Sequence, residues 1–362
     1  MAHRPVFGHR ALRERLAAAW HAGRLPSSLL LVGRRGIGKQ RLALWLGQLL
    51  LCERAHAEGL LDPCGSCQQC RYAAKGSHPD LRWYFPRPNI TGDPAPEVIQ
   101  ADLSEVIAER MTADGLWAPS LGSEGIQVAA ARSIVKQASV RPAMAARAVF
   151  VVGDAERMVA QEGADQAANA FLKLLEEPPP GTTLILTSSE PGMLLPTVRS
   201  RVVTMRVPPL SRTDVEAFLD DPAVARRVTG MSREEAIQRS AGAPGELLAG
   251  EATAKAFASA RKLLDAAIQP STPVGTAERV KAAARHSMAG ARGAFTDTLE
   301  ALVVVLHERT RQLVASGHEP EARRTAQAIM DVEATKRRAQ GNVNPQLLVA
   351  ALLAAMHRTL RP

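Results

Sequence analysis

The sequence predicts an α/β protein with a parallel sheet, followed by a long helical region. Short apolar runs alternate with helical stretches through the first 208 residues, which is the pattern of a parallel sheet covered by helices on both faces. A glycine-rich phosphate loop lies where the first apolar run gives way to a helix. From residue 211 onward no clear strand-like run occurs, and the pattern is helical to the end.

Length and charge limit the classes of protein to consider. A chain of 362 residues is long enough for two or three domains with a sizeable core. The formal net charge is +9, and from Thr253 onward 16 Lys and Arg stand against 9 Asp and Glu. This C-terminal surplus favours an anionic partner such as nucleic acid, although it also serves solubility. No run of eighteen apolar residues and no secretory signal occurs, so we expect a soluble cytoplasmic protein with no membrane segment.

The first strand is expected at residues 28–32 and leads into residues 33–40, which read GRRGIGKQ. In a loop of the pattern GxxxxGK[ST], backbone N–H groups and the next helix N-terminus surround the phosphates, and the lysine reaches the β and γ oxygens. The following segment, RLALWLGQLLLCE, has helical spacing, so the loop lies between a strand and a helix as the motif requires. The alternative is an ordinary turn with an incidental lysine. The candidate phosphate-binding residues are Gly33, Gly36, Gly38 and Lys39.

The last position of this loop departs from the pattern. Gln40 stands where a Ser or Thr hydroxyl normally ligates Mg²⁺. A glutamine does not easily supply that short, hard oxygen ligand. We therefore expect the loop to bind phosphate without ligating Mg²⁺.

All four cysteines lie between positions 52 and 70, with the spacing C-x11-C-x2-C-x2-C. The x2 spacing lets thiolates converge on one tetrahedral ion, and zinc is the natural ion for four thiolates. An iron–sulfur cluster is the second choice, whereas two disulfides in a reducing compartment, or a redox pair, fit less well. The expected ligands of a structural Zn²⁺ are Cys52, Cys64, Cys67 and Cys70.

Four further strands are expected at residues 81–85, 148–152, 183–187 and 202–207. Before the third strand of the chain, residues 87–124 are rich in Pro, Gly and acidic residues, with an amphipathic helix expected from 97 to 111. We interpret this segment as an insertion in the α/β domain. A solvated surface excursion is the favoured interpretation over a binding element.

The pattern changes after Pro208 and Pro209, where Ser211 is expected to cap a helix. A break at residues 242–250, GAPGELLAG, separates a small helical part from a longer one, and residues 269–275 mark a loop within the latter. The predicted domains are therefore an α/β domain at 1–208 with a zinc module at 52–70, a small helical domain at 209–252 and a helical domain at 253–362.

With these elements in order, the chain resembles the clamp-loader branch of the AAA+ proteins over nearly its whole length. The segments that carry the resemblance are AGRLPSSLLLVGRRGIGK at 22–39, the cysteine cluster followed by HPD at 78–80, NAFLKLLEEPP at 169–179, and LTSSEP followed by TVRSR at 186–201. The long 87–124 segment departs from the more compact pattern of the family. The resemblance implies an ATPase-type α/β domain, a helical lid and a C-terminal helical collar that joins subunits.

Three positions, compared with motor subunits of this family, indicate that the chain does not hydrolyse ATP. Gln40 lacks the metal-binding hydroxyl. Gly153 occupies the Asp position of the motor's Asp-Glu pair, which leaves only Asp154. Gly245 stands where a motor carries an arginine that senses the γ-phosphate. Since phosphoryl transfer depends on such groups, we expect negligible intrinsic hydrolysis, while ATP binding without turnover remains compatible with Lys39.

One catalytic segment of the family is kept. Ser200 and Arg201 match its Ser-Arg-Cys motif, with Val202 in place of the cysteine. The resemblance implies that Arg201 is an arginine finger offered in trans to the ATP of a neighbouring subunit. Such an arginine is worth ~10³ to 10⁵ in turnover in related NTPases. The alternative is a strand-edge arginine in a surface ion pair.

The expected function is that of a non-hydrolysing, stator-type subunit of a bacterial clamp loader, which loads a sliding clamp onto primer-template DNA during replication. The expected partners are gamma/tau and delta subunits, with the clamp contacted indirectly and DNA through the assembly. The alternatives are a gamma/tau-type subunit that hydrolyses ATP, and a P-loop nucleotide kinase, to which the helical C-terminal third is hard to fit. A zinc-dependent DNA-binding module is a further alternative, but CGSCQQC has few basic or aromatic residues.

Overall fold

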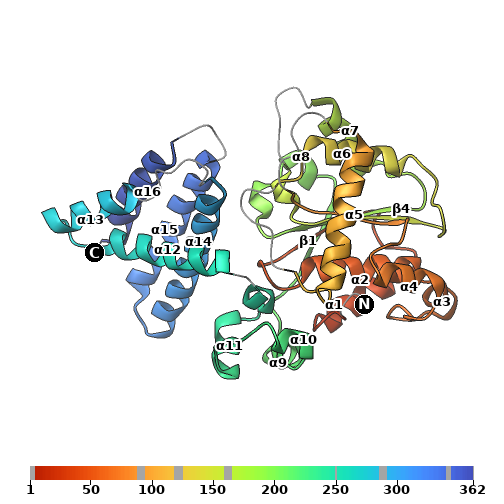
Figure 1. The fold of residues 1–362 in the computed structure, drawn as a ribbon, viewed down its shortest axis with the longest axis horizontal. Coiled ribbons are helices and arrows are strands. Elements are labelled where there is room, and N and C mark those ends of the chain that lie inside the picture. The colour runs from red at the N-terminus through yellow and green to blue at the C-terminus, as the bar shows by residue number, and fades with distance from the viewer. Residues whose placement is uncertain are drawn as a thin grey trace. The chain divides into compact units, whose positions relative to one another are not determined.

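The computed structural model describes residues 5–87, 94–117, 125–158, 165–248, 251–284, 292–339 and 344–361. The described residues divide into two compact units (Figure 1). The first ends at residue 248 and contains the sheet, and the second begins at residue 251 and is helical.

One parallel sheet of five strands forms the centre of the first unit. The strands lie in the order β2-β3-β4-β1-β5, and each neighbouring pair is parallel. Their bounds are β1 Ser28–Val32, β2 Leu81–Tyr84, β3 Ala148–Val152, β4 Thr182–Ser188 and β5 Val203–Arg206. Each strand ends within one residue of the apolar run that predicts it, so the prediction of a parallel α/β sheet is confirmed.

The burial of the strands explains why their sequences are apolar without alternation. Every residue of β3 and β4 is buried, and β1 is buried up to its last residue. A parallel sheet carries helices on both faces, so both sides of each central strand need apolar side chains. β5 lies at the edge of the sheet, and most of its residues are exposed.

Helices cover the sheet from two sides. Figure 1 shows α1 and α2 on one side of the strands and α6 and α7 on the other. The bounds are α1 Arg10–His21, α2 Lys39–Leu51, α3 Glu53–Glu58, α4 Gln68–Ala74, α5 Pro96–Thr112, α6 Val128–Ala138, α7 Asp165–Glu176 and α8 Pro196–Arg199, with short 3₁₀ turns η1 Ala155–Arg157 and η2 Pro191–Met193.

A group of small helices follows the last strand. They are α9 Arg212–Leu219, α10 Pro222–Ala225, α11 Arg233–Ser240 and the 3₁₀ turn η3 Pro244–Leu248. Ser211 caps α9 as predicted, since its hydroxyl accepts from the Asp214 N–H at 3.1 Å while the Asp214 carboxylate accepts from the Ser211 N–H at 3.3 Å. This reciprocal capping fixes the point at which the chain leaves the sheet.

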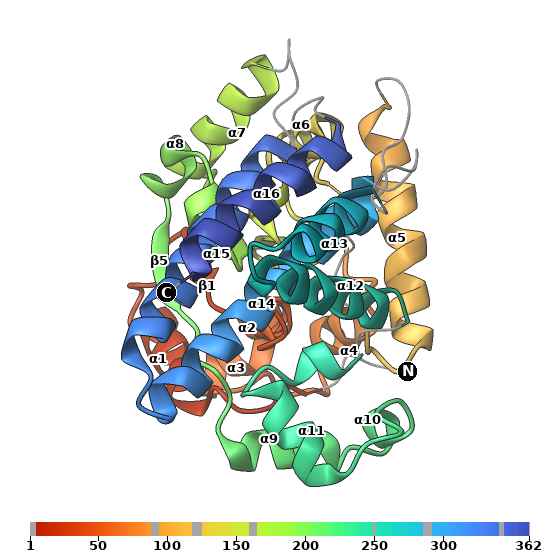
Figure 2. The same ribbon diagram turned by 90° about the vertical axis from the view of Figure 1, so that its left-hand side faces the viewer.

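The second unit consists of helices in the part of it that the structure describes (Figure 2). They are α12 Glu251–Ile268, α13 Pro273–Ala284, α14 Arg292–Ala315, α15 Glu319–Ala339 and α16 Pro345–Leu360. These helices enclose an apolar core of their own, with Leu302, Val332 and Met356 fully buried. Of all the described helices, none combines the length and the hydropathy needed to cross a bilayer.

The segment at 87–124 differs from the solvated excursion expected for it. The predicted helix at 97–111 is present as α5, but Ile99 and Leu103 on it join the main core. After the helix, Leu116 is only 4 % exposed. The apolar residues of α5 recur at helical spacing, so one face packs on the protein. Residues 88–93 and 118–124 lie outside the described residues.

Candidate functional site

Three segments meet at the carboxyl edge of the sheet. Because β3, β4 and β1 are parallel neighbours, the residues that follow them lie side by side. These are the loop at 33–38 after β1, Gly153 and Asp154 after β3, and Ser189 after β4. Ligands of open parallel sheets bind at this edge.

The loop at 33–38 has the geometry of a phosphate loop. It turns through Gly36 and Gly38, whose φ angles of 76° and 91° lie in the left-handed region that side chains disfavour. Gly38 precedes α2, so the N-terminus of this helix points at the loop. Backbone N–H groups and the helix dipole then favour an anion. Gly33 opens the loop, where its N–H donates to the Ser188 carbonyl at 3.2 Å.

The ammonium group of Lys39 is already surrounded by groups of the same chain. Its Nζ donates to the Arg34 carbonyl at 2.9 Å and to Ser189 Oγ at 2.8 Å, and the residue is 5 % exposed. Burial lowers the pKa of Lys39, while nearby carboxylates, Asp154 first, act to raise it. The positive charge of the loop therefore faces protein carboxylates.

Glu156 is one of these carboxylates. Its Oε1 accepts from the Ser189 N–H at 2.9 Å, and its Oε2 is buried with no hydrogen-bond partner among the residues described. Burial, assisted by the charge of Asp154, raises the pKa of Glu156 to about 7. This carboxyl group therefore titrates near neutral pH.

The side chain of Gln40 occupies the space beside the loop. Its Nε2 donates to Asp154 Oδ2 at 3.0 Å, and its Oε1 accepts from Trp83 Nε1 at 3.1 Å. A Cβ atom built on Gly153 would lie 2.5 Å from the Gln40 amide carbon. A side chain at position 153 and Gln40 in this conformation therefore exclude each other.

The turn η3 closes directly onto the loop. The Gly245 N–H donates to the Gly36 carbonyl at 2.9 Å, and a Cβ atom on Gly245 would lie 2.8 Å from that oxygen. Arg35 Nε lies 3.9 Å from Glu246 Oε1. A larger residue at position 245 would require the loop to move.

A cleft lies beside the phosphate loop. Its apolar wall is drawn from the N-terminal segment, the residues after α5 and the small helices. The wall includes Val6, Phe7, Leu116, Trp117, Phe218 and Leu248. With the N–H groups of the loop, the cleft has an apolar end and an anion-binding end, which is the combination that a nucleotide requires.

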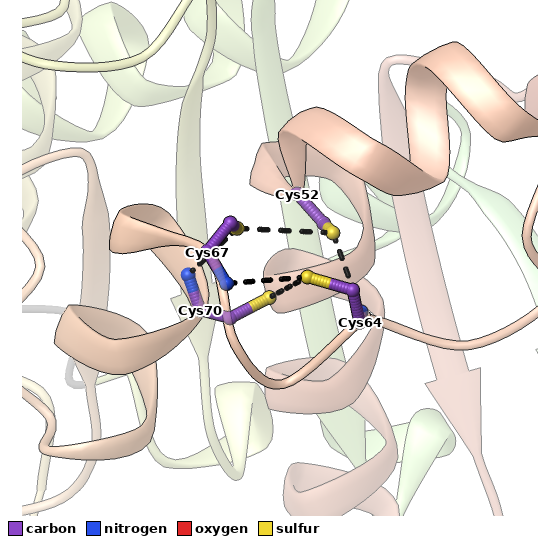
Figure 3. Close-up of side chains that lie close together, drawn as sticks. All are labelled: Cys52, Cys64, Cys67 and Cys70. Carbon is purple, nitrogen blue, oxygen red and sulfur yellow. Dashed lines mark hydrogen bonds between the residues drawn. The ribbon is translucent and has the colours of Figure 1, made fainter.

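The four predicted metal ligands converge on one point (Figure 3). The Sγ atoms of Cys52, Cys64, Cys67 and Cys70 all lie within 4.8 Å of one another. None of these cysteines, which are all in the described part of the chain, forms a disulfide. Four converging thiols can hold a divalent ion such as zinc, and because every ligand is a protein group, such a site has no open position for a substrate.

Backbone N–H groups point at the sulfur atoms of this cluster. The N–H groups of Ala55 and Cys64 each donate to Cys52 Sγ at 3.3 Å, and that of Cys67 donates to Cys64 Sγ at 3.3 Å. Burial acts to raise the pKa of Cys64, but N–H donation from Cys67 and Ser66 outweighs it and lowers the pKa to about 6. Such donation stabilises the Cys64 thiolate, the form that binds metal, whereas burial raises the pKa of Cys52 and Cys70.

Arg201 and Ser200 lie at the opposite edge of the sheet from the phosphate loop. They precede β5, which runs parallel to β1, whereas the loop follows β1. A five-residue strand spans about 16 Å. Arg201 is therefore out of reach of the phosphate loop of its own chain.

The guanidinium of Arg201 is held by three groups. Its Nε donates to Glu176 Oε2 at 2.9 Å, and its Nη1 donates to the Thr197 carbonyl at 3.0 Å and to Ser200 Oγ at 3.4 Å. The side chain is 30 % exposed, and Nη2 has no partner in the described part of the chain. The group is thus oriented, with one nitrogen open.

Some of these contacts lie beyond what spacing in the sequence indicates. Trp83 and Gln40 are 43 residues apart, and no pattern links them. Glu176 lies in the LLEEPP segment, which stands out in the sequence. Its pairing with Arg201 is not evident from the sequence, because it depends on how α7 and α8 pack.

Comparison with known proteins identifies relatives of this chain. A family model described as DNA polymerase III, delta subunit, matches residues 8–211. The chain is 29 % identical to DNA polymerase III subunit delta prime of Escherichia coli over 298 residues, which cover 79 % of this chain and 72 % of that protein. It is 32 % identical to the delta prime subunit of Pseudomonas aeruginosa over 220 residues, or 59 % of this chain and about half (52 %) of that protein.

A more distant similarity extends to a structure. The crystal structure of a DNA polymerase III gamma subunit-related protein from Thermotoga maritima aligns with 96 % of this chain and 100 % of that chain, at 16 % identity and a TM-score of 0.37. That score is too low to support the fold, which rests on the observed sheet.

Proposed function

The chain belongs to the DNA polymerase III delta-subunit family, and from that membership we propose that it is a delta prime-type stator in the clamp loader. In this role it binds no catalytic metal and hydrolyses no ATP. It supplies Arg201 to the ATP site of a neighbouring subunit. The assembly then loads the sliding clamp onto primer-template DNA.

The observation that carries the proposal is the Gln40 side chain. Its amide donates to Asp154 and fills the space left by the missing side chain of Gly153. In hydrolysing P-loop sites, a hydroxyl and an aspartate at these positions hold Mg²⁺. Here Gln40 and Gly153 supply neither of these ligands, and the Gln40 amide hydrogen-bonds to Asp154. Phosphate binding by Lys39 without turnover remains compatible with this arrangement.

The position of Arg201 supports the arginine-finger role. Since Arg201 is out of reach of its own phosphate loop, any phosphate that it serves belongs to another chain. Glu176 and Thr197 hold the guanidinium, while Nη2 stays open. An arginine that is already oriented loses less conformational entropy when it meets a phosphate.

We extend the proposal to partners and domains. The partners are gamma/tau and delta subunits, and the clamp and DNA are reached through the assembly. Residues 209–252 act as a lid, and residues 253–362 act as a collar that joins the subunits. A structural Zn²⁺ binds the four cysteines. The family membership, the helical second unit and the thiol cluster support these proposals.

The test is ATP turnover by the reconstituted loader in the presence of clamp and DNA. Arg201→Ala is compared with wild type and with Arg199→Ala, a neighbouring exposed arginine on α8. The ATP site that receives Arg201 should lose roughly 10³-fold or more in turnover. Total turnover should then fall to what the remaining sites supply, with Arg199→Ala close to wild type.

Two further measurements separate the alternatives. The isolated chain should show no turnover of ATP, whereas a gamma/tau-type subunit would hydrolyse it. The substituted loader should keep its subunits during size-exclusion chromatography. Unchanged turnover with Arg201→Ala would refute the finger, and hydrolysis by the isolated chain would refute the stator role.

A further inference from the structure

The five residues after α5, numbers 113–117, connect two parts of the first unit that are distant in the sequence. We call these residues the strap. On one side they contact α2 of the α/β core, and on the other they contact the small helices α9 and α10. Both sets of contacts lie beside the cleft over the phosphate loop.

The helix that carries the strap is fixed to the core. Ile99 and Leu103 of α5 are buried in the main core. Asp102 on the same helix accepts two hydrogen bonds from Arg87, from Nε at 2.8 Å and from Nη2 at 3.0 Å. Gln100 Nε2 donates to the hydroxyl of Tyr84 on β2 at 3.2 Å. α5 is therefore a firm base for the residues that follow it.

A tight turn ends α5 and forms the start of the strap. Asp114 and Gly115 have φ angles of 60° and 66°, and the Gly115 N–H donates to the Arg110 carbonyl at 2.9 Å. This is the hydrogen-bond pattern of a right-handed helix that ends with residues in the left-handed conformation. The helix carboxyl end carries partial negative charge, which favours cations nearby.

Arginines that follow α10 bind this turn from the side of the small helices. Arg227 donates from Nη2 to the Ala113 carbonyl at 3.0 Å and from Nη1 to the Leu116 carbonyl at 3.4 Å. Arg226 Nη2 lies 3.1 Å from Asp114 Oδ2. One guanidinium thus bridges two carbonyl groups of the strap.

Arg41 binds the turn from the side of the core. It lies in α2, directly after Gln40, and its Nη2 donates to the Gly115 carbonyl. Its guanidinium also lies 4.4 Å from the ring centroid of Trp117, a cation–π contact. The Trp117 ring in turn lies 4.8 Å from that of Trp83. The strap is therefore attached to the helix that follows the phosphate loop.

Leu116 adds an apolar contact to these polar ones. It is 4 % exposed and forms a cluster with Phe218, Ala223 and Val224 of α9 and α10. This cluster is distinct from the main core, to which α9 and α11 contribute Val215 and Ile237. Leu116 is its one buried member from outside the small helices, among the residues described.

We propose that the strap holds the small helices against the phosphate-loop face of the core when no nucleotide is bound. A nucleotide between two such parts would link them through its own contacts. In this chain the protein makes the link, because the strap contacts of Arg41, Leu116 and Arg227 add to the packing of Val215 and Ile237 in the main core. The inference deepens the proposed stator role, because a stator needs a fixed shape that does not depend on ATP.

The test is hydrogen exchange of the isolated full-length chain, purified free of nucleotide. The amides of α9 and α11 should be protected in the wild type. Arg227→Ala and Leu116→Ala should each speed their exchange by about tenfold or more, while β3 and β4 keep their protection. Arg239→Ala, which removes an exposed arginine of α11, is the matched control and should change nothing.

The outcomes are distinct. Selective loss of protection in α9 and α11 supports the strap. Equal exchange in all variants overturns it, as do unprotected small helices in the wild type. Loss of protection in β3 and β4 as well would also overturn it, because the contact would then serve overall stability. The experiment uses no loader and no ATP turnover, so its result is independent of the Arg201 test.

Discussion

At the scale of residues, Gln40 and Gly153 depend on each other. The Gln40 amide occupies space that a side chain at 153 would need, and it finds partners in Asp154 and Trp83. The absence of a side chain at position 153 is therefore what allows the Gln40 amide to take this place. Restoring a side chain at position 153 alone would displace the Gln40 amide.

This dependence predicts non-additive stabilities. Gly153→Ala should lower the free energy of unfolding by about 1 kcal/mol, because the flexible Gln40 side chain must move and give up its hydrogen bonds to Asp154 and Trp83. In a Gln40→Ala background, where the amide is absent, the same substitution should cost much less. Chemical denaturation followed by tryptophan fluorescence measures both, since all four tryptophans lie in the first unit. Additive costs would contradict the pairing.

Glu156 predicts a pH dependence. Its folded-state pKa of about 7 lies above the ordinary value of 4.5, so the folded protein binds more protons than the unfolded chain between these values. The contribution to stability is complete below pH 4.5 and is lost as the pH rises through 7.

Glu156→Gln keeps a neutral side chain of the same size and should remove this slope. The variant should be ~1–3 kcal/mol more stable than wild type at pH 8 and similar to it at pH 4. Denaturation curves at several pH values measure the difference. Parallel pH profiles for the two proteins would show that Glu156 is not the group responsible.

At the scale of elements, the cysteine segment is too short to be stable by itself. α3 has six residues and α4 has seven, and isolated helices of this length are marginal in water. Cys52 and Cys67 cap their first turns, with sulfur accepting from the backbone. The proposed metal would therefore fix the ends of both helices at once.

This arrangement predicts one zinc ion per chain. Elemental analysis of the purified protein should find it, and Cys64→Ser should lose most of it. Limited proteolysis should then cut between residues 52 and 75 in the variant, because metal binding supplies the stability of such a segment. Gln68→Ala, an exposed residue next to a ligand, is the control and should keep both zinc and resistance. If elemental analysis finds iron and sulfide in stoichiometric amounts and no zinc, the cysteines hold an iron–sulfur cluster instead.

The elements differ in how well the sequence predicts them. The buried strands were predictable because both faces need apolar residues, which gives unbroken runs. The helix α5 was predictable from its spacing. The role of the strap was not, since Leu116 and Trp117 are two apolar residues after a turn, and Arg227 lies more than a hundred residues away. Likewise, the spacing of the cysteines was enough to predict their cluster. The contacts of Arg201 could not be predicted, because they depend on how α7 packs against α8.

At the scale of the whole molecule, the two units have separate apolar cores in the described part of the chain. The first core joins residues from α1 to α11, and the second joins residues from α12 to α16. Each core is large enough to support an independent domain. Stability measured by tryptophan fluorescence therefore reports on the first unit alone.

This separation predicts that residues 1–248 fold without the rest of the chain. The fragment should show the same fluorescence-detected denaturation midpoint as the full-length protein, and it should retain zinc. Circular dichroism of the full-length chain should show a further helical transition that the fragment lacks. A fragment that is unfolded would show that the second unit is required for the first.

The opposite positions of the phosphate loop and Arg201 give the molecule a polarity. Contacts that join the loop side of one chain to the arginine side of the next are head-to-tail, so they build a row with a direction rather than a twofold dimer. In the proposed role, this chain has an active arginine side and an inert loop side. In that role, a neighbour on the loop side of this chain would find no working ATP site, so the row keeps all its active sites when this chain stands at the end where its loop side meets no neighbour.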